Sequence, residues 1–309
     1  MTPDLTVDLC GVRLRNPLVL ASGVLGTDST LLHRVARTGL GAVTAKSCSL
    51  EPRAGHPNPT VLDWGPGIIN AVGLANPGVE RQLDILQRSR ELLAPYGVAI
   101  FASIVGNTVD DFARVAERVS QAQPDLIEVN ISCPNVISEF GELFSTRPES
   151  AAAVTRAVKG ATAIPVSVKI SPNVSDIVSV ARAVAEAGAN AITAINTVGP
   201  GMVIDVESGR PVLSNNEGGL SGPAIRPIAI RCVYQIARAV QIPIIGTGGV
   251  TRGRDVVEML MAGATAVGVG SAVYWGGPEV FSDLTGELND FMAAHGYDSL
   301  ESIRGVATR

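Results

Sequence analysis

Eight short apolar segments recur along the 309-residue chain, and longer amphipathic stretches separate them. The segments are rich in valine and isoleucine and are apolar on both faces, as strands buried on both sides of a parallel sheet must be. Between them, apolar residues recur at helical spacing, as at residues 109–121, 150–159, 176–187 and 255–261. The predicted strands lie at residues 17–22, 42–46, 98–103, 126–130, 165–170, 191–196, 243–248 and 266–271.

Eight strand–helix units in series predict an α/β fold, a closed (β/α)8 barrel of the TIM-barrel type. An open doubly wound sheet is the alternative. It usually places a GxGxxG phosphate loop after its first strand, where this chain reads ASGVLGTD. Residues 4–15 are predicted to form an N-terminal β-hairpin that closes the bottom of the barrel. Residues 47–78 and 197–222 are long connections, which we expect to be inserted loops at the C-terminal face.

The same pattern bears on helix ends and on domain organisation. Thr108 and Ser175 precede two of the helical stretches, and we expect their hydroxyls to cap these helices. No Gly/Ser-rich linker interrupts the alternation of strands and helices. Residues 1–309 are therefore expected to form a single domain.

Composition and charge argue against several classes of protein. The chain has 24 basic and 29 acidic residues, and a net charge of −5 argues against a nucleic-acid or anionic-membrane surface. Its four cysteines lack CxxC spacing and its three histidines are scattered, so we expect no metal site and no iron–sulfur cluster. The N-terminus lacks the regions of a signal peptide, and no apolar run is long enough to span a membrane. We expect a cytoplasmic protein without a membrane segment.

Two glycine-rich segments, GTGGV and GVGSA, follow the seventh and eighth predicted strands. In a (β/α)8 barrel the chemistry takes place at the C-terminal ends of the strands. The glycines, among them Gly248, Gly249 and Gly270 beside Ser271, would let backbone N–H groups approach a phosphate closely. Tight turns are the plainer interpretation of either segment alone, but the pair favours a ligand that bears phosphate.

Lys46 and Lys169 end the second and fifth predicted strands. A buried ammonium is costly without a partner, so the plainer role for either lysine is an ion pair with a loop carboxylate. Either lysine could instead bind an anionic substrate group or stabilise negative charge on a reduced cofactor. Lys169 could also form a Schiff base, as in barrel aldolases. The residues alone leave these alternatives open.

Cys133 follows the fourth predicted strand in the segment NISCPN. A lone cysteine is more often a packed small residue, but Pro134 restrains this one to extended backbone at a strand end. A thiol there could act as a general base or as a nucleophile. Asn130 and Asn196 also end strands, where their amides suit a cyclic amide or imide ring.

A resemblance to class 1 dihydroorotate dehydrogenases is carried by the segments TAKS, NAVGLANPG, NISCPNV, VKISPNVSDI, INTVGPG, GGLSGPAIRP, GTGGV and GVGSA. The match spans roughly residues 5–300 in the family's order. A cysteine in NISCPN is typical of class 1, because class 2 enzymes carry serine there. The amino-acid sequences of the later segments are most similar to type 1B, the NAD-linked catalytic subunit.

The resemblance implies FMN at the barrel mouth, with dihydroorotate or orotate stacked on it. Cys133 would be the catalytic base that takes the C5 proton while FMN takes the C6 hydride. Lys46 would pair with the substrate carboxylate, and Lys169 would stabilise reduced FMN. The implied FMN contacts are Ser22, Lys46, Ser47, Ser103, Asn130, Lys169, Ile195, Gly222, Gly248, Gly249, Gly270 and Ser271. The implied substrate contacts are Lys46, Asn70, Ala71, Val72, Gly73, Leu74, Asn130, Asn196 and Thr197.

One position departs from the type 1B pattern. That pattern often reads ANVAG after the third strand, with the asparagine facing the flavin, whereas this chain reads ASIVG. Ser103 can still form a hydrogen bond there, but its side chain has a shorter reach. Type 1A enzymes, which use fumarate, tend to carry serine at this place.

The resemblance to type 1B also implies partners. A homodimer of this chain would bind an electron-transfer subunit that carries FAD and a [2Fe–2S] cluster, giving a heterotetramer that passes electrons to NAD⁺. Three alternatives compete with this interpretation. They are a dihydropyrimidine dehydrogenase-type FMN barrel acting on uracil or thymine, a Schiff-base aldolase using Lys169, and a non-catalytic barrel that binds a phosphate ligand.

Overall fold

Eight parallel strands form a closed barrel in the computed structural model, which describes residues 3–132 and 144–309. Each strand pairs with its two neighbours in the order β10-β15-β16-β3-β4-β7-β8-β9, and β9 returns to β10. The barrel strands are β3 (Leu18–Leu20), β4 (Ala42–Thr44), β7 (Ala99–Ile104), β8 (Leu126–Asn130), β9 (Val166–Ile170), β10 (Ala191–Ala194), β15 (Ile244–Thr247) and β16 (Ala266–Val269).

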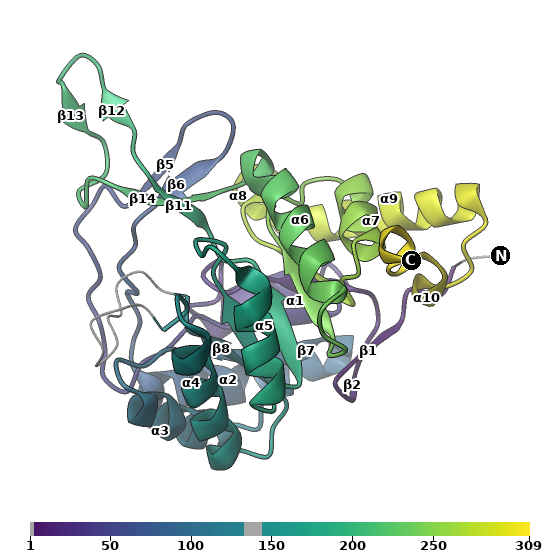
Figure 1. Cartoon of the computed structure of the whole chain (residues 1–309), viewed down its shortest axis with the longest axis horizontal. Helices are drawn as coiled ribbons and strands as arrows, with labels where there is room; N and C mark the ends of the chain where they lie inside the picture. Colours follow the sequence, from purple (N-terminus) through teal and green to yellow (C-terminus); the bar gives the residue numbers. More distant parts are fainter. Residues whose placement is uncertain (1–2, 133–143) are drawn as a thin grey trace.

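Helices surround the barrel and follow the strands in chain order (Figure 1). Their apolar faces pack on the strands, so the main core lies between the barrel and its helical layer. No helix in the described part of the chain combines the length and apolar character needed to cross a bilayer. The α-helices are α1 (Ser29–Ala36), α2 (Val79–Leu93), α3 (Val109–Ser120), α4 (Pro148–Ala161), α5 (Ile177–Glu186), α6 (Arg226–Ala237), α7 (Gly253–Met261), α8 (Ala272–Gly276), α9 (Val280–His295) and α10 (Leu300–Ile303).

The barrel predicted from the alternating segments is confirmed, because each of the eight predicted segments overlaps one barrel strand. β8 and β9 are buried at every position, as strands with a core on both faces must be. Thr108 caps α3 as expected, since its hydroxyl accepts from the Asp111 N–H. The expectation for Ser175 is wrong. Asp176 caps α5, and its carboxylate accepts from the N–H groups of Val178 and Ser179.

A β-hairpin lies across the N-terminal ends of the barrel strands, as predicted. Its strands, β1 (Val7–Leu9) and β2 (Val12–Leu14), pair antiparallel. The Cys10 thiol donates to the carbonyl oxygen of Asn190 at 3.1 Å, just before β10 begins. Leu9 and Leu14 are fully buried. The hairpin therefore covers the end of the barrel opposite to the C-terminal rim.

The two long connections form a small sheet, where we expected inserted loops. β5 (Val61–Asp63) and β6 (Ile68–Asn70) come from the first connection, and β11 (Val198–Gly201) and β14 (Gly218–Ser221) come from the second. They pair antiparallel in the order β11-β14-β6-β5. All four strands are short, and β11 and β14 are rich in glycine, so they carry little of the alternation that predicts a strand.

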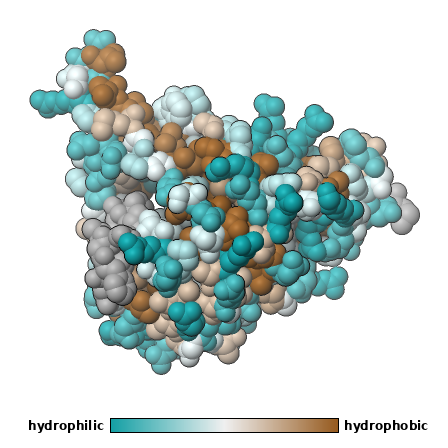
Figure 2. Space-filling view, in the orientation of Figure 1, coloured by the Kyte–Doolittle hydropathy of each residue, from teal (hydrophilic) through white to brown (hydrophobic). Residues whose placement is uncertain are grey.

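A hairpin of β12 (Ile204–Asp205) and β13 (Arg210–Pro211) projects beyond this sheet at the upper left of Figure 1. Figure 2 shows hydrophobic residues gathered along this projection. Met202, Ile204 and Val206 are exposed there, with Val206 at 86%. The second connection therefore carries apolar side chains away from the barrel and into solvent.

Loss of a buried side chain from the N-terminal hairpin should destabilise the barrel. Because Leu9 is fully buried, we expect Leu9→Ala to lower the free energy of unfolding by about 2–5 kcal/mol, measured by urea denaturation. Arg13→Ala, on the exposed face of the same hairpin, is the matched control and should change it by less than about 0.5 kcal/mol. Equal effects of the two substitutions would show that the hairpin does not pack on the barrel.

Candidate active site

Lys169 crosses the inside of the barrel near its C-terminal rim. It lies on β9, and its Nζ donates to the hydroxyl of Ser22, just after β3, at 3.1 Å. Because β9 and β3 lie on opposite sides of the barrel, the side chain that joins them spans the interior. Nζ also lies 3.7 Å from Oε1 of Glu128, and the side chains of this ion pair are only 7% and 6% exposed. The lysine is thus a buried cation with a carboxylate partner.

A chain of hydroxyls leads to the same carboxylate oxygen of Glu128 that lies beside Lys169. The Ser103 hydroxyl donates to Glu128 Oε1 at 3.2 Å, and the hydroxyls of Ser103 and Ser47 are 2.8 Å apart. An ionised carboxylate only accepts hydrogen bonds, so the single hydroxyl proton of Ser103 goes to Glu128. Ser47 must then donate to Ser103. The polar cluster therefore runs from Ser47 to Ser22 through residues of five strands or strand ends.

The amides expected to bind a ring lie beside this cluster. Asn130 is the register partner of Lys169 in the β8–β9 pair. Its Oδ1 accepts from the Ser132 hydroxyl at 2.8 Å, and Asn196 Nδ2 donates to the same hydroxyl at 2.6 Å. The backbone N–H of Thr197 donates to Asn196 Oδ1 at 2.8 Å. The structure thus brings Asn130, Asn196 and Thr197 together, as the resemblance implies.

Asn70 joins this group through the small sheet. Its Nδ2 donates to the carbonyl oxygen of Gly219 at 3.3 Å. A Cβ on Gly219 would lie 2.1 Å from the hydroxyl of Thr197, so the two residues are in close contact. The four-stranded sheet therefore holds Asn70 close to the amides at the rim.

The segment from Ala71 to Leu74 is held by a neighbouring loop. The His56 N–H donates to Val72 O at 3.1 Å, and the His56 ring nitrogen Nδ1 lies 3.0 Å from Ala71 O. Gly73 and Leu74 both have positive φ, so the backbone turns sharply there. All four residues are partly exposed and keep accessible surface.

The glycines after β15 are sterically required. Gly249 has φ +75°, and a Cβ there would lie 2.8 Å from the carbonyl oxygen of Gly222 and 2.7 Å from Arg226 Cβ. A Cβ on Gly248 would lie 2.7 Å from Ala229 Cβ and 3.5 Å from Ile195. The structure therefore brings Ile195, Gly222, Gly248 and Gly249 together in one closely packed loop cluster.

The remaining predicted contacts lie at neighbouring strand ends. Gly270 follows β16, where a Cβ would meet Ala21 at an ordinary 3.5 Å, so packing does not require glycine there. Ser271 precedes α8. The Lys46 backbone N–H donates to Gly26 O at 2.8 Å, and the residue is partly buried beyond the end of β4.

Cys133 lies outside the described residues. Of the three cysteines within them, Cys48 is fully buried and burial raises the pKa of its thiol to about 12. Burial and the nearby Asp8 raise the pKa of Cys10 to about 11, and burial also raises that of Cys232. None of these three thiols is suited to exchange protons near neutral pH.

Sequence reasoning missed Glu128, Ser132 and His56. Glu128 is an acidic residue inside the apolar segment LIEVN, and that contrast was a signal for a buried charge with a partner. Ser132 lies between Asn130 and Cys133, and its hydroxyl bridges the two asparagine side chains. His56 carried no pattern of its own, because its contact with the 71–74 segment depends on the fold of the first connection.

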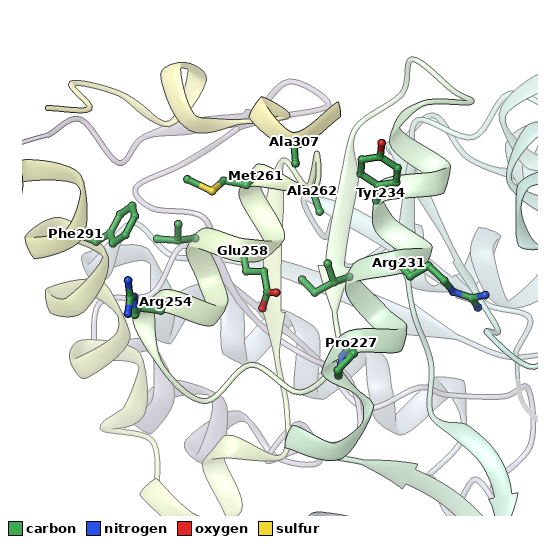
Figure 3. Close-up of a pocket in the computed structure, with 11 residues that line it drawn as sticks. Pro227, Arg231, Tyr234, Arg254, Glu258, Met261, Ala262, Phe291 and Ala307 are labelled. Carbon is green, nitrogen blue, oxygen red and sulfur yellow. The ribbon is translucent and has the colours of Figure 1, made fainter. Parts of the chain in front are cut away.

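A separate pocket lies on the outside of the barrel, between α6, α7, α9 and the C-terminal segment (Figure 3). Its lining is largely apolar and includes Tyr234, Met261 and Phe291. In Figure 3 the side chains of Arg231 and Arg254 point in opposite directions, so they do not converge on a common ligand. This pocket contains none of the residues predicted to bind cofactor or substrate.

Comparison with known proteins agrees with this geometry. Residues 4–292 match the family model for dihydroorotate dehydrogenase. The chain is 46% identical to dihydroorotate dehydrogenase B (NAD(+)), catalytic subunit, from Methanothermobacter thermautotrophicus, over 98% of each chain. It is 44% identical to the protein of the same name from Bacillus pumilus, over 97% of this chain and 96% of that one.

A solved structure shares the fold. The crystal structure of DHODH in complex with ferulenol from Eimeria tenella superposes with a TM-score of 0.86. The match covers 99% of this chain and 89% of that chain at 22% identity, so it bears on the fold alone. The family match over residues 4–292 and the relatives of the same name at 46% and 44% identity establish that the chain belongs to the dihydroorotate dehydrogenase family.

Proposed function

We propose that this chain oxidises (S)-dihydroorotate to orotate in pyrimidine biosynthesis, as the FMN-binding catalytic subunit of an NAD⁺-linked dihydroorotate dehydrogenase. The observation that carries the proposal is the convergence, on one barrel rim, of a buried lysine, a group of asparagines and a closely packed glycine cluster. The family match and relatives named as NAD⁺-linked catalytic subunits support it. We further propose that residues 1–309 form one domain and that the protein is cytoplasmic.

The residues at the rim fit FMN. The backbone at Gly248 and Gly249 has no room for a Cβ, which suits a loop that a phosphate approaches closely. The buried hydroxyl of Thr247, the last residue of β15, has no hydrogen-bond partner among the described residues. When bound, FMN supplies the acceptor for a hydride. Lys169 would face its negative charge in the reduced state, and the other contacts would be those that the resemblance implies.

The proposed substrate site uses the asparagine group. Dihydroorotate presents N–H and C=O edges, and an asparagine amide can both donate to and accept from such a ring. Asn70, Asn130 and Asn196 would orient the ring, with Thr197 and the Ala71–Leu74 segment beside it. Lys46 would pair with the carboxylate, the group that distinguishes dihydroorotate from dihydrouracil.

Cys133 is the proposed base for the C5 proton. It belongs to the segment that continues from Asn130 and Ser132, both of which lie in the asparagine group. The pKa of each of the other three cysteines is raised by burial, which leaves Cys133 as the best suited thiol in the chain. In the reverse direction the same thiol would return the proton.

The alternative functions are less well supported. A Schiff-base lysine must present a neutral amine, whereas Lys169 is held between Glu128 and Ser22. The relatives and the family model are named for dihydroorotate and not for uracil or thymine. Dihydroorotate is therefore the preferred substrate of this proposal.

The assembly that we propose is a homodimer bound to an electron-transfer subunit. The relatives' name, catalytic subunit, supports a separate partner, and FAD and a [2Fe–2S] cluster would lie on that partner. The projecting hairpin exposes Met202, Ile204 and Val206, and apolar side chains on an extended surface favour contact with another chain. The net charge of −5 argues against a nucleic-acid partner.

Gly249→Ala tests the cofactor loop. The new Cβ would lie 2.8 Å from Gly222 O in a backbone with φ +75°, and strain of this kind should weaken FMN binding about tenfold or more. Fluorescence titration of the FMN-free protein measures the dissociation constant. Gly286→Ala is the matched control, because a Cβ there meets nothing within 4 Å on α9. Unchanged FMN affinity in Gly249→Ala would contradict the placement of the cofactor.

Cys133→Ala tests the base. The variant should stay yellow, and flavin bleaching by dihydroorotate in anaerobic stopped flow should slow by about 10²–10⁴-fold, the usual contribution of a general base. Cys10→Ala, which removes a thiol at the N-terminal end of the barrel, should bleach at the wild-type rate. A wild-type rate of bleaching in Cys133→Ala would show that Cys133 is not the base for the C5 proton.

The electron acceptor can be tested on the same reduced protein. We expect that NAD⁺ does not reoxidise the chain alone, because the chain lacks a cysteine cluster for an iron–sulfur relay. NAD⁺ should reoxidise it once the electron-transfer subunit is added. Parallel additions of fumarate and a quinone complete the measurement, and rapid reoxidation by fumarate of the chain alone would contradict the type 1B assignment.

A further inference from the structure

Glu128 is the buried charge for which the proposed reaction has no role. Its side chain is 6% exposed, and within the described part of the chain it is the carboxylate that pairs with Lys169, at 3.7 Å from Nζ. Removing the charges of such a pair from water is expensive, and replacing buried ion pairs by apolar residues often stabilises a protein. A stabilising role is therefore a weak explanation for a carboxylate in the middle of an apolar strand.

The register of the strands places Glu128 deeper in the barrel than the lysine. In the β8–β9 pair, Glu128 is opposite Ser167, and Asn130 is opposite Lys169. Glu128 thus lies one inward-facing position closer to the N-terminal end of the barrel. Lys169 reaches from β9 to Ser22 on the far side of the barrel, above this carboxylate. A group bound at the rim would meet the lysine, with Glu128 behind it.

The hydroxyl chain fixes the carboxylate in place. Ser47 donates to Ser103, and Ser103 donates to Glu128 Oε1 at 3.2 Å. Ser47 and Ser103 are both at least 95% buried, at 4% and 1% exposure, so solvent does not compete for these bonds. The negative charge is therefore held at a defined distance from the ammonium, and it offsets part of the positive potential that Lys169 presents at the rim.

We propose that Glu128 is a positioning residue that acts through Lys169 to lower the reduction potential of the bound flavin. The inference rests on the proposed function, in which Lys169 faces the negative charge of reduced FMN. Glu128 directs the ammonium toward Ser22 and partly cancels its charge, so that the flavin accepts electrons from substrate and still passes them on. Without this carboxylate, the lysine would hold the reduced flavin more tightly.

The test is the midpoint potential of bound FMN in Glu128→Gln, measured by spectroscopic redox titration against reference dyes. Glutamine keeps the size of the side chain and an acceptor for Ser103 but removes the charge. We expect the ratio of reduced to oxidised FMN at fixed potential to rise about tenfold, which is ~30 mV for a two-electron couple. Glu80→Gln is the control, because it removes a surface carboxylate paired with Arg118 and should leave the potential unchanged.

Glu128→Asp keeps the test decisive if the glutamine variant does not fold. Its carboxylate would lie farther from Lys169, so we expect a smaller rise in the same direction. Thermal unfolding of the FMN-free proteins gives the separate cost in stability. A lower melting temperature with an unchanged or lower potential would overturn the proposal and leave Glu128 a structural counterion. A wild-type protein that does not bind FMN would instead overturn the proposed function.

Discussion

Closure of the eight-stranded barrel is the constraint on which the site depends. Strand ends far apart in the sequence meet only because the strands pair around a closed ring. The bond from Lys169 to Ser22 joins residues 147 positions apart and crosses the interior. A shift of one residue in the register of β8 would turn Glu128 and Asn130 outward and Val129 inward, which would remove the carboxylate and the amide together.

Branched aliphatic side chains usually fill the interior of such a barrel in layers. Near the C-terminal ends of these strands, polar side chains take their place. Ser167 and Thr193 share a hydrogen bond of 2.9 Å between neighbouring strands, next to the ion pair of Glu128 and Lys169. Such an interior contributes little hydrophobic stabilisation. The barrel is therefore held mainly by the apolar layer between its strands and helices, which leaves the interior near the rim available for charge and hydrogen bonding.

The barrel and much of its rim could be predicted because they follow from local patterns. Strands buried on both faces are continuous runs of apolar residues, and the ends of such runs mark the rim, which located Lys169, Asn130 and Asn196. The small sheet could not be predicted, since its short strands pair across long separations. Asn70 and Gly219, for example, are 149 residues apart. Their contact depends on two connections that only the closed barrel brings together.

Ser103 shows how a departure from a family pattern can be understood only with its partners in view. From the sequence, serine in place of asparagine meant a shorter reach toward the flavin. In the structure its hydroxyl is already engaged, since it accepts from Ser47 and donates to Glu128. On our proposal, Ser103 therefore affects the reduction potential of the flavin indirectly, because it holds the Glu128 carboxylate that offsets the charge of Lys169. A longer amide at this position would compete with that carboxylate for the same space, so the identity of residue 103 and the charge presented at the rim are linked through Glu128.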